Sequence, residues 1–190
     1  MPVAKGETLD PAATRAKILD SATRLFYERG TLAVGVNEVA EAAGVSKVTL
    51  YRHFENKEDL VGEFLRRRSD RVSAWLRDVS ANAEGPERVL ALFDALEQWF
   101  AEPAFRGCAL VNGAVESRGV EAEARKIAAR HLERHLSLLR ELSGDEDMAR
   151  KLLVLVEGAT TVAFVRGDPR AARDAREVAA ALLSSASPGC

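Results

Sequence analysis

The chain has 190 residues, 47% hydrophobic and 29% charged, a composition typical of a globular protein with its own core. Its 27 basic and 29 acidic residues give a net charge of −2, which argues against a protein that coats nucleic acid without specificity. Two cysteines, Cys108 and Cys190, exclude a disulfide framework. Neither a signal peptide nor an apolar run of about 20 residues is evident, so we expect a cytoplasmic protein with no membrane partner.

Apolar residues recur at helical spacing along nearly the whole chain, and no stretch alternates as a half-buried strand would. The pattern predicts an all-α fold of about nine helices, separated by Gly, Pro and Asn. The expected helices span residues 11–29, 36–43, 47–54, 57–81, 86–101, 104–117, 120–142, 146–166 and 170–185. Short helices then give way to long helices rich in Leu, Ala and Val, which places a domain boundary near residue 55 and predicts domains 1–55 and 56–190.

Residues 36–54 carry the strongest local signal, two short helices joined by a tight turn. Gly44 supplies the turn, and Ser46 is placed to cap the second helix. Leu50 and Phe54, four residues apart, face the core. This arrangement is typical of a helix-turn-helix, whose second helix enters the major groove of DNA.

The side of the second helix opposite Leu50 offers hydrogen-bonding, aromatic and cationic groups. Lys47, Arg52 and Lys57 outnumber the single acidic Glu55 over residues 44–57, which gives this segment a local charge of +2. Such a face suits base edges and phosphates. The alternative is a helical hairpin that only packs against its neighbours, and it leaves the outward aromatic and basic groups without a role.

The order of these segments resembles the tetracycline-repressor (TetR) family. The matching parts are the apolar helix 14–26 leading to Gly30, the segments 39–46 and 50–54, and the Asn-Lys-Glu-Asp-Leu run 56–60. The resemblance covers about residues 12–62, and the run 106–112 is more weakly similar to the family's variable domain. It implies a DNA-binding domain over 1–55 and an effector-binding and dimerisation domain over 56–190.

The resemblance also implies roles for individual residues. Residues 47–49 would face base edges, while Ser46, Tyr51, His53 and Lys57 would hold backbone phosphates. The sequence departs from the family at Gly35, where a Ser or Thr is usual, and Asn37 is the candidate to replace that contact. The candidate DNA-binding residues are therefore Asn37, Ser46, Lys47, Val48, Thr49, Tyr51, Arg52, His53 and Lys57.

In the second domain the resemblance implies a small-molecule pocket enclosed by the helices 86–101 and 104–117, and two inward histidines of helix 120–142 are further candidates to line it. The apolar stripes of these helices are also compatible with plain core packing. The candidate effector-binding residues are Phe93, Trp99, Asn112, Glu116, His131 and His135.

His131 and His135 lie one turn apart inside the apolar arc of helix 120–142. Three interpretations remain open: core histidines with satisfied hydrogen bonds, ligand contacts, or a metal pair. Leu132 stands where a His-Glu-x-x-His site has Glu, and no third ligand is evident. We therefore predict no metal and no cofactor.

Two further features have a structural and a functional interpretation. We expect Cys108 to be a small core residue, and redox sensing is the alternative. The arginine run 66–68, with Arg71, reads as a solvated helix face, with a second DNA-contacting site as the alternative.

The last two expected helices suggest a second copy of the chain as partner. Helix 146–166 is apolar nearly all round from residue 152 to 165, and helix 170–185 presents small residues at helical spacing. The pair predicts half of a four-helix homodimer interface. Its candidate residues are Val154, Thr161, Val165, Ala172, Ala175, Ala179, Leu182 and Leu183.

These features predict a ligand-responsive DNA-binding transcriptional regulator, a repressor that binds a near-palindromic operator on double-stranded DNA as a homodimer. Effector binding is expected to shift helix 57–81 and release the operator. One alternative is a DNA-binding regulator without a small-molecule effector. The other is an all-helical enzyme, but no spacing of nucleophile, base and orienting group supports it, so we predict no catalytic residues.

Overall fold

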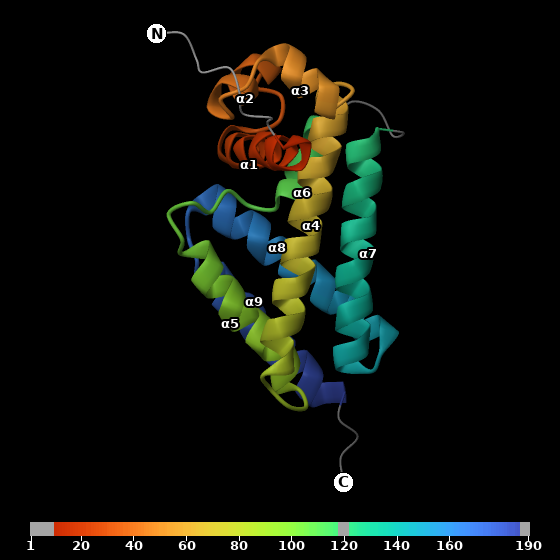
Figure 1. Ribbon diagram of the computed structural model, residues 1–190. Helices are drawn as coiled ribbons and strands as arrows, with labels where there is room; N and C mark the ends of the chain where they lie inside the picture. Colours follow the sequence, from red (N-terminus) through yellow and green to blue (C-terminus); the bar gives the residue numbers. More distant parts are fainter. Residues whose placement is uncertain (1–9, 118–121, 187–190) are drawn as a thin grey trace. The chain divides into compact units, whose positions relative to one another are not determined.

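The computed structural model describes residues 10–117 and 122–186, and this part of the chain contains nine helices and no strand (Figure 1). The chain divides into two compact units, Met1–Phe64 and Leu65–Cys190. The helices are α1 (Pro11–Arg29), α2 (Val36–Ala42), α3 (Lys47–His53), α4 (Lys57–Ala81), α5 (Glu87–Phe100), α6 (Ala109–Glu116), α7 (Glu123–Ser143), α8 (Glu146–Arg166) and α9 (Ala171–Ala186). The expected all-α class is confirmed, and no described helix is long and apolar enough to cross a membrane.

The first unit holds α1, α2, α3 and the first turns of α4. The fully buried side chains of Ile18, Leu50 and Phe54 form its core. Phe64 joins that core from α4, with its ring centroid 5.6 Å from that of Phe26. The units therefore divide inside α4, whereas the sequence pattern placed a boundary near residue 55.

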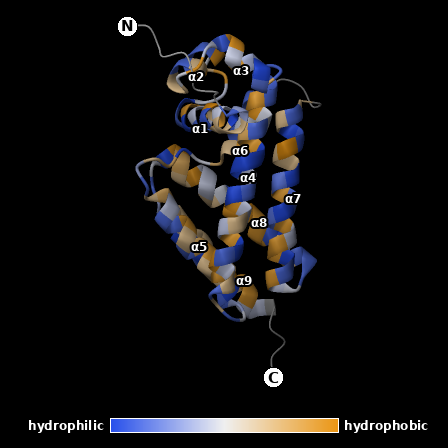
Figure 2. Ribbon diagram, viewed as in Figure 1, coloured by the Kyte–Doolittle hydropathy of each residue, from blue (hydrophilic) through white to orange (hydrophobic). Residues whose placement is uncertain are grey.

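The second unit holds the rest of α4 and α5 to α9. Its core centres on fully buried residues such as Phe93 and Leu152, and α8 packs against both α7 and α9, while α5 packs against α9. Figure 2 shows hydrophobic and hydrophilic residues interspersed along each of these helices, as expected where one side of a helix is packed and the other is wet.

The sequence prediction of helix 104–117 was wrong at its start, because α6 begins only at Ala109. Gly107 has φ +74, a conformation that does not continue a right-handed helix. A Cβ atom at this position would lie 3.1 Å from the side chain of Phe164 on α8. The backbone here must therefore both turn and approach α8 closely, which only glycine allows without strain.

The other helices follow the predicted ranges to within the usual uncertainty of helix ends. The expected start of helix 120–142 falls on residues 118–121, which lie outside the described part, and α7 is described from Glu123. Helices α7 and α8 end at Gly144 and Gly167, both left-handed, as glycines after a helix commonly are.

Candidate nucleic-acid interface and ligand pockets

The start of α3 is fixed by a side-chain cap. Ser46 Oγ accepts a hydrogen bond from the backbone N–H of Thr49 at 3.0 Å and lies 2.8 Å from Thr49 Oγ1. Leu50 is fully buried and Phe54 nearly so, which anchors the inner side of the helix. The outward direction of the remaining residues follows from these two anchors, as predicted.

The outer side of α3 carries large side chains that face solvent. Val48 is 64% exposed and Tyr51 is 42% exposed. The ammonium of Lys47 lies 5.9 Å from the centre of the Tyr51 ring, so a cation and an aromatic ring share this surface. Of the other candidate DNA-binding residues, Asn37, Ser46 and Arg52 are exposed and Thr49, His53 and Lys57 are half-buried.

The start of α2 lacks the side-chain cap that a Ser or Thr would give, since its N-cap is Gly35. Glu38 compensates in part, because its Oε1 accepts a hydrogen bond from the Gly35 backbone N–H at 3.1 Å. The other carboxylate oxygen of Glu38 lies 2.6 Å from an Arg29 nitrogen. These hydrogen bonds, from the backbone of Gly35 first and from Arg29 second, lower the pKa of the Glu38 carboxyl.

Three of the six candidate effector residues, Trp99, His131 and His135, line one small cavity in the second unit. Its volume is about 20 Å³, room for little more than a water molecule. The lining is completed by residues of α4 to α8, namely Arg68, Val72, Trp75, Leu76, Leu96, Cys108, Ala109, Leu110, Val156, Glu157 and Thr160. We call this cavity the inner pocket.

The predicted burial of the two histidines is confirmed, since His131 is 1% and His135 is 6% exposed. His131 Nδ1 lies within hydrogen-bonding distance, 3.0 Å, of Ser69 Oγ, and burial chiefly lowers the pKa of His131 to about 3, with the neighbouring His135 contributing. His131 is therefore neutral at pH 7. Among the described residues neither ring nitrogen of His135 has a hydrogen-bond partner, although Nδ1 lies 3.5 Å from Glu157 Oε1.

The other three candidate effector residues lie elsewhere. Phe93 is fully buried in the core, and Asn112 donates a hydrogen bond from Nδ2 to the Arg106 carbonyl at 3.1 Å. Glu116 ends α6, and it does not line the inner pocket. Helical spacing predicts which side chains point inward, but it does not predict whether an inward side chain lines a cavity or packs against another side chain.

Cys108 lines the inner pocket, and burial together with the nearby Glu157 charge raises the pKa of its thiol to about 11. A raised pKa leaves little of the reactive thiolate at neutral pH, which favours a structural role. Within the described residues, no group of three or more His, Cys, Asp and Glu side chains could hold a metal ion.

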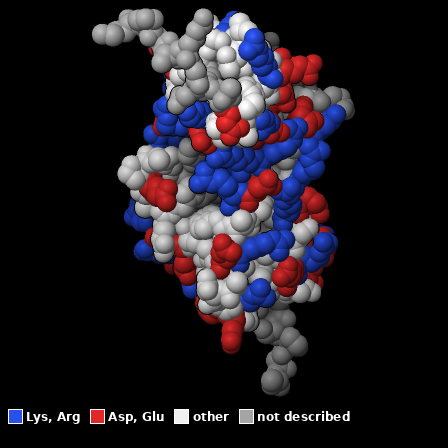
Figure 3. Space-filling view, in the orientation of Figure 1, with Lys and Arg blue, Asp and Glu red and all other residues white. Residues whose placement is uncertain are grey.

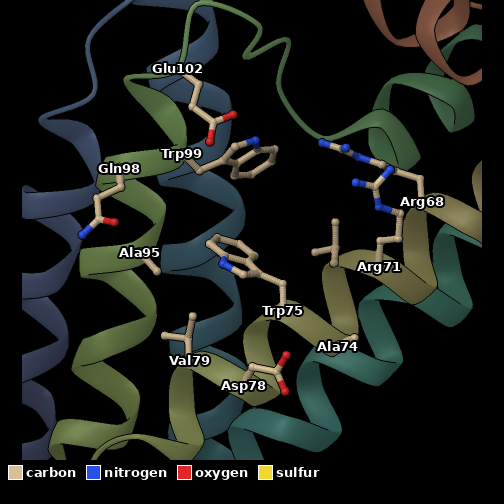
Figure 4. Close-up of a pocket in the computed structure, with 11 residues that line it drawn as sticks. Arg68, Arg71, Ala74, Trp75, Asp78, Val79, Ala95, Gln98, Trp99 and Glu102 are labelled. Atoms are coloured by element: carbon tan, nitrogen blue, oxygen red, sulfur yellow. The ribbon is translucent and has the colours of Figure 1, made fainter.

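A groove that the sequence pattern did not predict lies between α4 and α5, and Figure 4 shows it in close-up. Its volume is about 610 Å³, within the range of about 300–1,000 Å³ that is usual for small-molecule sites. It is lined by Arg68, Arg71, Val72, Ala74, Trp75, Asp78, Val79, Ala95, Gln98, Trp99 and Glu102. Arg68 and Arg71, which the sequence suggested as part of a solvated helix face, thus border a cavity. We call this cavity the α4–α5 groove.

Apolar side chains are exposed along α8 and α9. Val154 is 71% and Val165 is 74% exposed, and Thr161 is also exposed, so these three candidate interface residues lie at the surface. Three further apolar residues of these helices, which were not among the predicted interface residues, are also exposed: Val162, Phe164 and Val178.

The alanines of α9 require a correction. Ala172, Ala175 and Ala179 are buried in the core of their own chain, because α9 packs against both α5 and α8, and they offer no surface to a partner. Leu182 and Leu183 are half-buried against the same core. Small residues at helical spacing identified a close helix contact correctly, but the contact lies within the chain.

Comparisons with known proteins agree with the helix-turn-helix geometry. Residues 18–64 match the pattern of "Bacterial regulatory proteins, tetR family". The transcriptional repressor KstR2 of Mycobacterium tuberculosis is 37% identical over 93 residues, 46% of this chain and 46% of KstR2. The transcriptional activator FasR of Mycolicibacterium smegmatis is 33% identical over 92 residues, 48% of this chain and 42% of FasR. The matches thus span about half the length of these curated relatives.

The similarity in three dimensions extends over nearly the whole chain. A TetR-family transcriptional regulator from Streptomyces coelicolor has a TM-score of 0.85 and 26% identity, covering 92% of this chain and 96% of its own. Escherichia coli NemR in its reduced form has a TM-score of 0.77 and 20% identity, which shows the shared fold alone, over 87% of this chain and 95% of its own. KstR2, FasR and the Streptomyces coelicolor protein are each described as transcriptional regulators. Residues 18–64 are therefore a TetR-type N-terminal helix-turn-helix domain, and nearly the whole chain shares its fold with a TetR-family regulator.

Proposed function

We propose that this protein is a transcriptional repressor that binds a near-palindromic operator as a homodimer and is released by a small-molecule effector. The observation that carries the proposal is the outer side of α3, where Val48 and Tyr51 are exposed beside Lys47. An aliphatic, an aromatic and a cationic side chain thus share one solvent-facing side of the second helix of a helix-turn-helix. In the major groove the first two would gain contacts, Val48 with base edges and Tyr51 with backbone phosphate.

The DNA-binding part is tested by selecting operator fragments with the purified protein and measuring affinity by fluorescence anisotropy. Combined replacement Tyr51→Ala and Lys57→Ala removes two proposed phosphate contacts and should weaken binding at least about tenfold. Lys151→Ala is the matched control, because Lys151 is an exposed lysine of α8 paired with Asp147. Equal affinity of the double variant and the wild type would refute the proposed DNA contacts.

The homodimer part rests on the exposed apolar face of α8 and α9. Five large apolar side chains are exposed on these two neighbouring helices: Val154, Val162, Phe164, Val165 and Val178. An exposed apolar patch of this kind is typical of a protein–protein interface. A second copy of the chain, related by a two-fold axis, would bury this face against itself. Such a dimer presents two α3 helices to half-sites one DNA turn, or a multiple of it, apart.

Sedimentation velocity tests the dimer. Val154→Arg combined with Val165→Arg should give a monomer, because paired copies would bury uncompensated charge. Val115→Arg is the control, since Val115 is an exposed valine on α6, a helix that is not part of the proposed interface. A dimer that survives the double replacement, or a wild type that is monomeric at micromolar concentration, would refute this interface.

For the effector, we propose that it binds in the second unit, next to Trp99, on the side of α4 where His131 and His135 line the inner pocket. Support comes from the inner pocket that these residues line and from the α4–α5 groove beside it. Both cavities border α4, and α4 is one uninterrupted helix whose first residue is Lys57. An effector that favours one position of α4 would change operator affinity through its differential affinity for the two states, typically about 1–3 kcal/mol.

A further inference from the structure

The α4–α5 groove and the inner pocket share one wall. Arg68, Val72, Trp75 and Trp99 line both cavities. The inner pocket has room for about one water molecule, whereas the groove has about 610 Å³. In this conformation, therefore, a drug-sized molecule fits the groove and not the inner pocket.

Apolar and aromatic side chains form the middle of the groove (Figure 4). The rings of Trp75 and Trp99 are 6.0 Å apart between centroids and inclined at 67°, an edge-to-face pair. Val72 and Val79 on α4 and Ala95 on α5 extend this lining. The body of a ligand in the groove should therefore be apolar, and an aromatic ring would stack well here.

The two basic residues of the groove, Arg68 and Arg71, lie on the same side of it, on α4. Arg68 is half-buried, and its guanidinium carbon is 5.8 Å from the centre of the Trp99 ring. Arg71 follows one turn later on α4, and within the described residues it makes no ion pair. Asp78 and Glu102, the two carboxylates of the lining, are both exposed and therefore hydrated. Figure 3 shows Lys and Arg gathered over the middle of α4 and over α7.

We propose that the α4–α5 groove binds an amphipathic organic carboxylate, whose apolar body lies against Trp75 and Trp99 and whose carboxylate lies at Arg68 and Arg71. Guanidinium groups bind carboxylates through paired hydrogen bonds, and a partly buried guanidinium is screened less by water. A neutral apolar ligand would offer no anion to the exposed guanidinium of Arg71. A cation would meet the face of Trp99 where the Arg68 guanidinium already lies. The inference deepens the proposed function, on which it rests for the regulatory role of the ligand.

The experiment uses three probes with one body: 4-tert-butylbenzoate, 4-tert-butylbenzyl alcohol and 4-tert-butylbenzylammonium. Trp75 and Trp99 are the two tryptophans of the sequence and both line the groove, so tryptophan fluorescence of the full-length protein reports directly on this site. Calorimetry gives the affinities. The carboxylate should bind at least about tenfold more tightly than the alcohol, and the ammonium should bind most weakly.

Two variants of α4 locate the carboxylate. Arg71→Gln should weaken binding of the benzoate about tenfold and leave binding of the alcohol unchanged. Arg67→Gln is the matched control, because Arg67 is a neighbouring arginine of α4 that does not line the groove. Trp99→Phe should reduce the fluorescence response to the benzoate.

Four results would overturn the inference: no benzoate binding at millimolar concentration, equal affinity of the three probes, tightest binding of the ammonium, or an unchanged signal and affinity in Trp99→Phe. Equal weakening by Arg67→Gln and Arg71→Gln would also overturn it, as an unspecific charge effect. Operator binding is measured separately on the same samples. Loss of the probe result with intact operator binding refutes the carboxylate site alone, whereas a wild type that binds no operator refutes the proposed function.

Discussion

The two units present their candidate sites in opposite ways. In the first unit, the candidate residues of α3 project outward, and Val48 and Tyr51 remain exposed while Leu50 holds the helix in place. In the second unit, three of the six candidate residues line the inner pocket, and two of these, His131 and His135, are almost fully buried. A projecting surface suits a large, stiff partner such as duplex DNA, whereas a cavity suits a small ligand that must be surrounded. Stability and binding should therefore depend on different residues in the two units.

The largest contrast is expected between a buried and an exposed apolar residue. Phe93→Ala should lower the free energy of unfolding by about 3–5 kcal/mol, because it leaves a cavity in a packed core. Val48→Ala should change it by less than about 0.5 kcal/mol, since Val48 is mostly exposed, yet it should weaken operator binding. Urea denaturation followed by circular dichroism measures both. An equal loss of unfolding free energy in Val48→Ala and Phe93→Ala would contradict this prediction.

The next contrast concerns the dependence of the unfolding free energy on pH. The pKa of His131 is lowered from 6.5 to about 3 by burial, so between these values the unfolded chain binds a proton that the folded chain does not. Stability from this group is fully present above about pH 6.5 and is lost as the pH falls towards 3, on the order of a few kcal/mol in all.

His131→Asn should therefore flatten the dependence of unfolding free energy on pH over this window, even if it lowers stability at pH 7. Denaturation midpoints at a series of pH values give the comparison, and identical slopes for His131→Asn and the wild type would contradict it.

Salt dependence should distinguish the units more finely. Each phosphate contact adds roughly one to the slope of log affinity for DNA against log salt concentration. Lys57→Ala should reduce that slope by about 1, while Arg71→Gln, a charge removed from the second unit, should leave it unchanged. Anisotropy titrations of an operator fragment between low and moderate salt provide the slopes. A smaller slope in Arg71→Gln would place DNA contacts on the arginine run of α4 after all.

The smallest contrast concerns one ion pair in each unit. Arg15 lies 2.7 Å from Glu63 and over the Phe54 ring at 4.8 Å, whereas Arg173 lies 2.7 Å from Glu97. Both pairs are partly exposed, so each is worth under about 1 kcal/mol. Arg15→Ala should cost slightly more than Arg173→Ala because it also loses the contact with the ring. Urea midpoints in parallel decide the order, and the reverse order would show that the ring contact contributes nothing.

Sequence alone predicted the surface of α3 because its determinants are local. The cap at Ser46 and the four-residue spacing of Leu50 and Phe54 fix which side chains point away from the core, and the structure has this arrangement. The same periodicity correctly placed His131 and His135 inside the second unit. In each case one helix and its own spacing were sufficient.

Features that depend on two helices could not be predicted in this way. The buried alanines of α9, such as Ala175, have the spacing of an interface, but whether that interface lies within a chain or between chains depends on where α5 and α8 run. The α4–α5 groove needs Arg68 and Trp75 from one helix and Trp99 from another. Spacing within a single helix does not reveal that such residues meet across a gap.

Gly107 lies between the inner pocket and the proposed dimer face, and its lack of a side chain matters to both. Its backbone turns just before α6, which delivers Ala109 and Leu110 to the inner pocket, and it comes so close to Phe164 that any β-carbon would push against that ring. Phe164 is also one of the exposed residues of the proposed dimer face. Replacing Gly107 by any other amino acid should consequently disturb both the inner pocket and the pairing of subunits, although residue 107 itself belongs to neither site.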